Sequence, residues 1–234
     1  MTTEHREHRR VRSFVRRAGR ITPAQSRALV DLWPRFGLVV DGPLDLAAVF
    51  GRQAPRVLEI GFGTGEALLE MAEADAAHDF VGIEVHEPGI GHLLDQLAKR
   101  GLANVRVIRG DAAELVPVAF VPGSLERVLV YFPDPWPKKR HHKRRLLQAD
   151  LVAMLAARLR PGGLLHVATD WEDYAHEALT VLEAEPTLVN RAGPGQFAPR
   201  PAWRPRTRFE RRGERLGHAV FDLLFERAGT DHAG

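Results

Sequence analysis

The sequence predicts an α/β fold with a mostly parallel, doubly wound sheet and helices on both faces. Short apolar strands alternate with segments of helical period along most of the 234 residues. The strands are nearly continuous apolar runs, which is typical of parallel strands covered on both faces. Ligands of such sheets bind outside the carboxyl ends of the strands, so the residues that follow each strand are the candidate site.

Each expected element has a local pattern behind it. Strands are expected at residues 56–60, 80–85, 104–109, 128–131, 164–168 and 219–225. Thr22-Pro23 predicts a cap and first turn for a helix that ends near Asp31. Further helices are expected at about residues 66–74, 88–100, 144–159 and 171–183. The helix at 144–159 has apolar residues at 147, 151, 154, 155 and 159, which is the 3.6-residue period.

We expect a single domain over residues 21–228, between a basic, mobile arm at 1–20 and a flexible tail at 229–234. The arm has no apolar periodicity, so it either binds a phosphate backbone or is an ordinary disordered terminus. No apolar run reaches the ~18 residues of a membrane span, and no secretory signal is recognisable. With zero cysteines, the chain is typical of a cytoplasmic protein without disulfides or thiolate metal sites.

The net charge of +3 is distributed unevenly along the chain. Residues 1–20 carry +5, residues 21–137 carry −7 and residues 138–234 carry +5. An acidic middle between two basic ends is expected if one part holds a cationic cofactor and another a polyanion. The alternative is a solvated surface with a patchy charge distribution.

The glycine loop after the first long strand indicates which cofactor binds. Gly61, Gly63 and Gly65 have a spacing that differs from the G-x-G-x-x-G of dinucleotide-binding proteins. Glu59 stands two residues before them, where it would repel a pyrophosphate. The loop therefore disfavours a nicotinamide dehydrogenase and favours a ligand with an ammonium, a sulfonium and no phosphate, namely S-adenosylmethionine.

Three more carboxylates follow successive strands. Glu84 lies 23 residues after Gly61, the place where an acid accepts hydrogen bonds from ribose hydroxyls. Asp111 is placed to face the adenine amine, and Asp134 follows the fourth strand. Any one of them alone is equally well explained as a helix cap. Together they predict a cofactor site at the strand ends.

Asp134 lies in a proline-rich turn that leads into a basic run. The eight positions from Lys138 to Arg145 hold six Lys or Arg and two His, which predicts contact with a polyanion rather than a solvated helix start. Trp136, in the same turn, either stacks on a nucleobase or packs to hold the turn. His141 and His142 lack partners at metal-ligand spacing, so no metal is expected.

These motifs resemble those of bacterial tRNA (guanine-N(7)-)-methyltransferases. The resemblance rests on Phe132-Pro133-Asp134-Pro135-Trp136-Pro137-Lys138, on Arg140 to Leu146 and on Thr207 to Glu210, and it extends from about Trp33 to Phe225. It implies a Rossmann-like class I methyltransferase fold. The implied reaction is methyl transfer from S-adenosylmethionine to N-7 of guanine 46, in the variable loop of tRNA.

The resemblance also implies roles for individual residues. It places Glu59, Glu84, Asp111 and Asp134 around the cofactor, beside the glycine loop. It places Lys138, Asp170, Thr207, Arg208, Phe209 and Glu210 at the substrate. It places Arg140, His141, His142, Lys143, Arg144 and Arg145 against RNA. Arg208 stands where the family often has Lys, and the arm at 1–20 has no recognised counterpart.

Asp134 is the candidate catalytic residue. Guanine N-7 has a free lone pair and no proton, so no general base is needed, but a fixed carboxylate would stabilise the positive charge that develops on the ring. Asp170 either accepts a hydrogen bond from the guanine edge or caps the helix that follows it.

Two other functions remain open from the sequence. One is methyl transfer from the same cofactor to another RNA or to a protein side chain. The other is RNA binding without catalysis. Both a monomer and a homodimer are compatible with the sequence.

Overall fold

The computed structural model describes residues 20–206, residue 210 and residues 219–229. The expected N-terminal arm, apart from Arg20, and the expected tail beyond residue 229 lie outside the described residues. Three of the expected substrate residues, Thr207, Arg208 and Phe209, also lie outside them.

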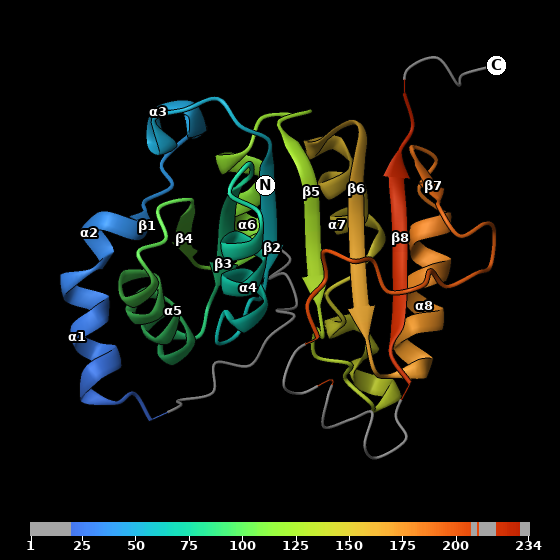
Figure 1. The fold of residues 1–234 in the computed structure, drawn as a ribbon. Coiled ribbons are helices and arrows are strands. Elements are labelled where there is room, and N and C mark those ends of the chain that lie inside the picture. The colour runs from blue at the N-terminus through green and yellow to red at the C-terminus, as the bar shows by residue number, and fades with distance from the viewer. Residues whose placement is uncertain (1–19, 207–209, 211–218, 230–234) are drawn as a thin grey trace, which may run out of the picture.

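The described residues form one sheet of eight strands (Figure 1). From one edge to the other, the strands are β1 (Gly37–Leu38), β4 (Val105–Arg109), β3 (Asp79–Glu84), β2 (Arg56–Ile60), β5 (Leu125–Tyr131), β6 (Leu159–Thr169), β8 (Phe221–Arg227) and β7 (Leu188–Asn190). The first six run parallel, and β8 is antiparallel to both of its neighbours. This order confirms the mostly parallel, doubly wound sheet.

Helices connect the strands and cover the sheet. They are α1 (Pro23–Asp31), α2 (Trp33–Phe36), α3 (Leu46–Phe50), α4 (Glu66–Ala74), α5 (Glu87–Arg100), α6 (Ala112–Ala119), α7 (Ala149–Arg158) and α8 (Glu172–Glu183), with a 3₁₀ helix η1 at Lys139–Arg144. The predicted start of α1 is confirmed, because Thr22 is the N-cap, Pro23 is the first helical residue, and Thr22 and Gln25 form a reciprocal capping box. Among the helices described, none is long and apolar enough to cross a membrane.

The sheet separates two apolar cores. Successive side chains of β2 point to opposite faces, as the pleat of a strand requires. Leu58 and Ile60 pack with α6, α7 and α8, whereas Val57 packs with α1, α4 and α5. Both faces of the central strands are therefore buried, which explains why these strands are apolar throughout.

The structure corrects one expected helix. The segment 144–159 was expected to be a single helix, but α7 begins at Ala149 and the basic residues before it form η1. Arg145 has an extended backbone, with φ −55° and ψ 136°, and this interrupts the helix. The basic run therefore precedes α7 instead of forming its first turn.

Several short elements were not expected from the sequence. They are α2, α3, α6, β1 and β7. β1 and β7 have two and three residues, too few to show a strand period. Pro117 lies inside α6 and weakens its helical signal.

Candidate functional site

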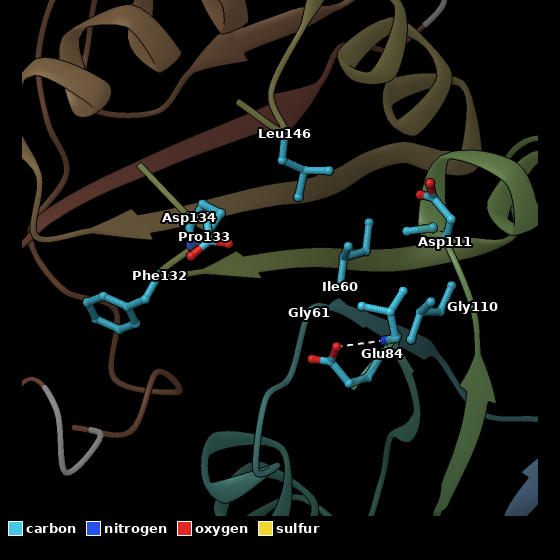
Figure 2. Close-up of a pocket in the computed structure, with 12 residues that line it drawn as sticks. Ile60, Gly61, Glu84, Gly110, Asp111, Phe132, Pro133, Asp134 and Leu146 are labelled. Carbon is cyan, nitrogen blue, oxygen red and sulfur yellow. Dashed lines mark hydrogen bonds between the residues drawn. The ribbon is translucent and has the colours of Figure 1, made fainter. Parts of the chain in front are cut away.

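The strand order reverses between β2 and β5. β3 and β4 lie on one side of β2, whereas β5 and β6 lie on the other. Such a reversal opens a crevice outside the carboxyl ends of the strands. A pocket of about 230 Å³ lies there, lined by residues that include Gly61, Glu84, Asp111 and Asp134 (Figure 2). The structure thus brings together residues that the sequence places after four different strands.

The glycine loop has a backbone that other residues rarely adopt. Gly61, Gly63 and Gly65 have φ angles of 74°, 58° and 78°. A side chain at these angles is strained, so glycine is required for the chain to turn from β2 into α4. Gly61 also lines the pocket, where the absence of a side chain lets a ligand approach the backbone.

Glu84 holds the glycine loop against the end of β3. One carboxylate oxygen accepts a hydrogen bond from the Gly63 amide at 2.8 Å, and the other accepts from the amides of Val85 and His86 at 2.6 and 2.9 Å. A carboxylate has about four acceptor positions, so capacity remains for a ligand hydroxyl. Glu84 lines the pocket and is only 8% exposed.

Asp111 both caps a helix and lines the pocket. Its carboxylate accepts a hydrogen bond from the Ala113 amide at 3.0 Å, at the N-terminus of α6. Figure 2 shows the same side chain at the rim of the pocket, beside Gly110. The helix-cap alternative is therefore observed, and it does not remove Asp111 from the site.

Glu59 is the most deeply buried acid near the site. It is 2% exposed, and its Oε2 atom is buried without a hydrogen-bond partner. Burial, and next the charge of Glu84, raise the pKa of Glu59 from 4.5 to about 8. Glu59 is not among the residues that line the pocket. A buried carboxyl with an unused oxygen is an open position for a donor such as an ammonium group.

The turn that carries Asp134 has an unusual backbone. Phe132 and Trp136 have φ angles of 49° and 44°, in the left-handed region that is uncommon for bulky residues. Such residues cluster at functional sites, where the surrounding structure holds them. The Phe132 amide donates to the Ala168 carbonyl at 2.7 Å. Asp134 is exposed at the rim of the pocket.

Arg145 fastens this turn to α8. Its Nε donates to the Pro135 carbonyl at 2.9 Å, Nη2 pairs with Asp173 at 2.5 Å, and Nη1 pairs with Glu177. Its guanidinium lies over the Tyr174 ring, and the residue is 1% exposed. The structure does not support the prediction that Arg145 contacts RNA, because the side chain is buried and has its partners within the chain.

The rest of the basic run lies closer to solvent. Lys138, Arg140 and Lys143 are exposed. The Arg144 guanidinium lies 5.0 Å from the centre of the Trp136 ring, and the His141 ring meets the same indole edge-on at 5.7 Å. Trp136 therefore packs against the basic run, and its two predicted roles, stacking on a nucleobase and holding the turn, stay predictions.

Asp170 does not cap α8. It is exposed at the end of β6. The Trp171 amide donates a hydrogen bond to the Thr169 hydroxyl oxygen at 3.3 Å, and not to Asp170. The N-cap position of α8 is Trp171, which makes no side-chain cap. The cap role is not observed for Asp170, and its contact with the guanine edge stays a prediction.

Sequence reasoning missed a buried polar cluster behind the turn. It comprises Tyr131, His166, Asp222 and Arg204. Arg204 also binds Glu210, the described member of the expected substrate segment. The available signal was a single His and a single Asp inside two apolar strands. The described part of the chain contains no group of three or more His, Asp or Glu residues placed to hold a metal ion.

Comparisons with known proteins place the chain among methyltransferases. Residues 53–223 match a family model described as "putative methyltransferase". The chain is 56% identical to a tRNA (guanine-N(7)-)-methyltransferase of Alcanivorax borkumensis, covering 94% of this chain and 92% of that protein. It is 58% identical to the protein of the same name from Alkalilimnicola ehrlichii, covering 97% and 95%.

A solved structure supports the fold independently. The aminoglycoside resistance methyltransferase NpmB1 matches with a TM-score of 0.56 at 18% identity, covering 79% of this chain and 92% of that chain. At this identity the likeness concerns the fold, which is Rossmann-like and of class I.

Glu59→Gln should flatten the pH dependence of stability between about pH 5 and pH 8. The folded protein keeps the Glu59 proton up to a pKa of about 8, whereas the unfolded chain loses it near 4.5. The unfolded chain therefore binds fewer protons, and this carboxyl should lower the free energy of unfolding by about 1.4 kcal/mol per unit of rising pH. Urea denaturation of both proteins across this range measures the difference. Parallel pH profiles would contradict a protonated Glu59.

Arg145→Met should lower the free energy of unfolding by about 2–4 kcal/mol, because it removes charge-assisted hydrogen bonds to a buried guanidinium. Lys143→Met is the matched control, since Lys143 is an exposed cation of the same run. Its effect should stay within about 0.5 kcal/mol. Equal effects of the two substitutions in urea denaturation would show that Arg145 does not fasten the turn.

Proposed function

Because the chain belongs to the family of tRNA (guanine-N(7)-)-methyltransferases, we propose that it methylates guanine 46 in the variable loop of tRNA. The reaction transfers a methyl group from S-adenosylmethionine to guanine N-7. The observation that carries the proposal is that the pocket and the exposed basic residues meet in the segment that follows β5. There Asp134 lines the pocket at the strand ends, and the exposed basic residues begin four positions later.

The residues at the strand ends fit the cofactor. Glu84 has acceptor capacity for ribose hydroxyls, and Asp111 faces the same pocket from the next strand, where the adenine amine is expected. The glycine loop can contact the cofactor through its backbone, and it contains no cationic side chain that would bind a phosphate. Glu59, with a buried and unpaired oxygen, suits the ammonium of the methionine part. When bound, S-adenosylmethionine supplies an electrophilic methyl group on its sulfonium.

The chemistry requires alignment more than proton transfer. Guanine N-7 attacks through a lone pair, so the protein contributes by holding the base in line with the methyl group. As the methyl group moves, positive charge appears on the guanine ring. A carboxylate held in a rigid turn beside the ring stabilises that charge in the transition state, and we assign this role to Asp134.

We assign the methyl-acceptor side to residues in and near the segment that follows β5. Lys138 follows the turn, and Asp170 is exposed at the end of β6, next to the end of β5 in the sheet. Asp170 suits the donors on the guanine edge. Thr207, Arg208, Phe209 and Glu210 complete this assignment on the strength of the family resemblance.

We assign RNA contact to the basic run without Arg145. Its residues are Arg140, His141, His142, Lys143 and Arg144. Phosphates would balance the charge of these neighbouring cations. A tRNA-modifying enzyme meets its substrate in the cytoplasm, which is where we place the protein.

The purified protein should transfer labelled methyl from S-adenosylmethionine to a tRNA transcript with guanine at position 46. The same transcript with adenine at position 46 should take no label. Nucleoside analysis should identify the product as 7-methylguanosine, and tRNA from cells without the gene should lack it at this position. Label at a different guanine would refute position 46, and label in protein alone would refute the tRNA assignment.

Asp134→Asn should lower turnover by about 100-fold or more, because the amide cannot balance the developing charge. The affinity for tRNA should change little, since Asp134 is a single exposed acid at the rim. Single-turnover kinetics and a binding titration measure the two quantities separately. Equal losses in both would argue against a transition-state role.

Lys143→Gln combined with Arg144→Gln should reduce the slope of log affinity for tRNA against log salt concentration by about 1–2, because each cation that meets a phosphate releases counterions. Arg160→Gln is the control, since Arg160 is half exposed and pairs with Glu126 near the start of β5, at the opposite end of the strand from Asp134. An unchanged slope in the double variant would exclude this run from the RNA interface.

A further inference from the structure

A chain of buried polar side chains runs behind the catalytic turn. The Tyr131 hydroxyl lies 3.0 Å from His166 Nδ1, and His166 Nε2 lies 2.7 Å from Asp222. Burial lowers the pKa of His166 despite the nearby Asp222 carboxylate, so the imidazole is neutral. Nε2 then donates to Asp222, and Nδ1 accepts from Tyr131. These residues come from β5, β6 and β8, three neighbouring strands.

Arg204 joins this chain to Glu210. Its Nε and Nη2 donate to the two oxygens of Asp222 at 2.7 and 2.9 Å. Its Nη1 and Nη2 donate to the two oxygens of Glu210 at 2.6 and 2.8 Å. Arg204, Asp222 and Glu210 are 1%, 3% and 4% exposed. One guanidinium therefore binds two buried carboxylates, each through both of its oxygens.

The same guanidinium touches the turn that carries Asp134. Its central carbon lies 5.9 Å from the centre of the Phe132 ring. Phe132 has a positive φ, lines the pocket and stands two positions before Asp134. Arg204 thus binds Glu210 and Asp222 of β8 and lies near the Phe132 ring of the Asp134 turn.

We propose that Arg204 is a positioning residue that holds Glu210 in register with the Asp134 turn. The proposal rests on the proposed function, because it concerns the methyl-acceptor side of that site. The Glu210 carboxylate is buried and bound by Arg204, which fixes the position of this residue. Asp222, which is held by His166, accepts hydrogen bonds from Arg204 and so orients the guanidinium plane.

The geometry requires arginine. A guanidinium presents five N–H donors in a rigid plane, so it can bind two carboxylates side by side. A lysine in the same place would keep the positive charge but would lose the planar set of donors that binds two carboxylates. Burying charged groups is a weak source of stability compared with apolar packing, which favours a role in specifying geometry.

The test compares Arg204→Lys, Glu210→Gln and the double variant with the unaltered enzyme. Each single variant should lower kcat for tRNA methylation by roughly 10- to 100-fold, as expected when a reacting group is misplaced. The affinity for S-adenosylhomocysteine should be unchanged, because Glu84, at the end of β3, and Asp111, at the N-terminus of α6, are not part of the Arg204 cluster. The double variant should lose no more than Arg204→Lys alone, since that substitution already breaks the Arg204–Glu210 interaction.

Arg191→Lys is the matched control. Arg191 pairs with Glu226 of β8 at 3.0 Å but is exposed and far along the strand from Asp222. Its kcat should equal that of the unaltered enzyme.

Three outcomes would overturn the proposal: an unaltered kcat in Arg204→Lys, losses that multiply in the double variant, or a parallel loss of S-adenosylhomocysteine affinity. If Arg204→Lys does not fold, Glu210→Gln carries the kinetic test alone, and an unaltered kcat again overturns it. A double-mutant cycle in urea denaturation tests the Arg204–Glu210 pair without any assay of activity. Failure of the unaltered enzyme to methylate tRNA would instead refute the proposed function.

Discussion

Four carboxylates at the ends of four parallel strands impose the main physical constraint on this structure. Charges of one sign that lie near one another destabilise a fold unless each is neutralised, bonded or hydrated. The protein uses all three means. Glu59 keeps its proton, Glu84 accepts three backbone hydrogen bonds, Asp111 caps α6, and Asp134 stays exposed. The pocket that results is acidic, rich in acceptors and suited to a cationic nucleoside cofactor.

Arginine serves two different purposes around this pocket. Arg145 and Arg204 are buried, and their partners are carboxylates and, for Arg145, a backbone carbonyl within the chain. Arg140 and its exposed neighbours remain available for a polyanion. The sequence alone does not show which arginines are buried and which are exposed, because nothing in a run of cations distinguishes its members. Burial separates them, and it makes Arg145 structural although it belongs to the basic run.

The differences between the expected and observed elements have local physical causes. The apolar period of residues 147–159 is real, but Arg145 leaves the helical region to reach Pro135, Asp173 and Glu177, so the helix starts later. β1 exists only because β4 offers it an edge to pair with. In the first case a tertiary contact overrides the local helical pattern. In the second case a tertiary contact creates a strand that no local pattern predicts.

The sequence by itself determined the fold class, the order of the parallel strands along the chain, the glycine loop and the four acids, because these follow from periodicity and from what each residue type can do. It also pointed to the family through the motif around Asp134. Only the tertiary structure decided which acid is protonated, which arginines are buried and which residues support Glu210. Those properties depend on burial and on partners far apart in the chain, such as Arg204 and Asp222. No local pattern encodes such distances.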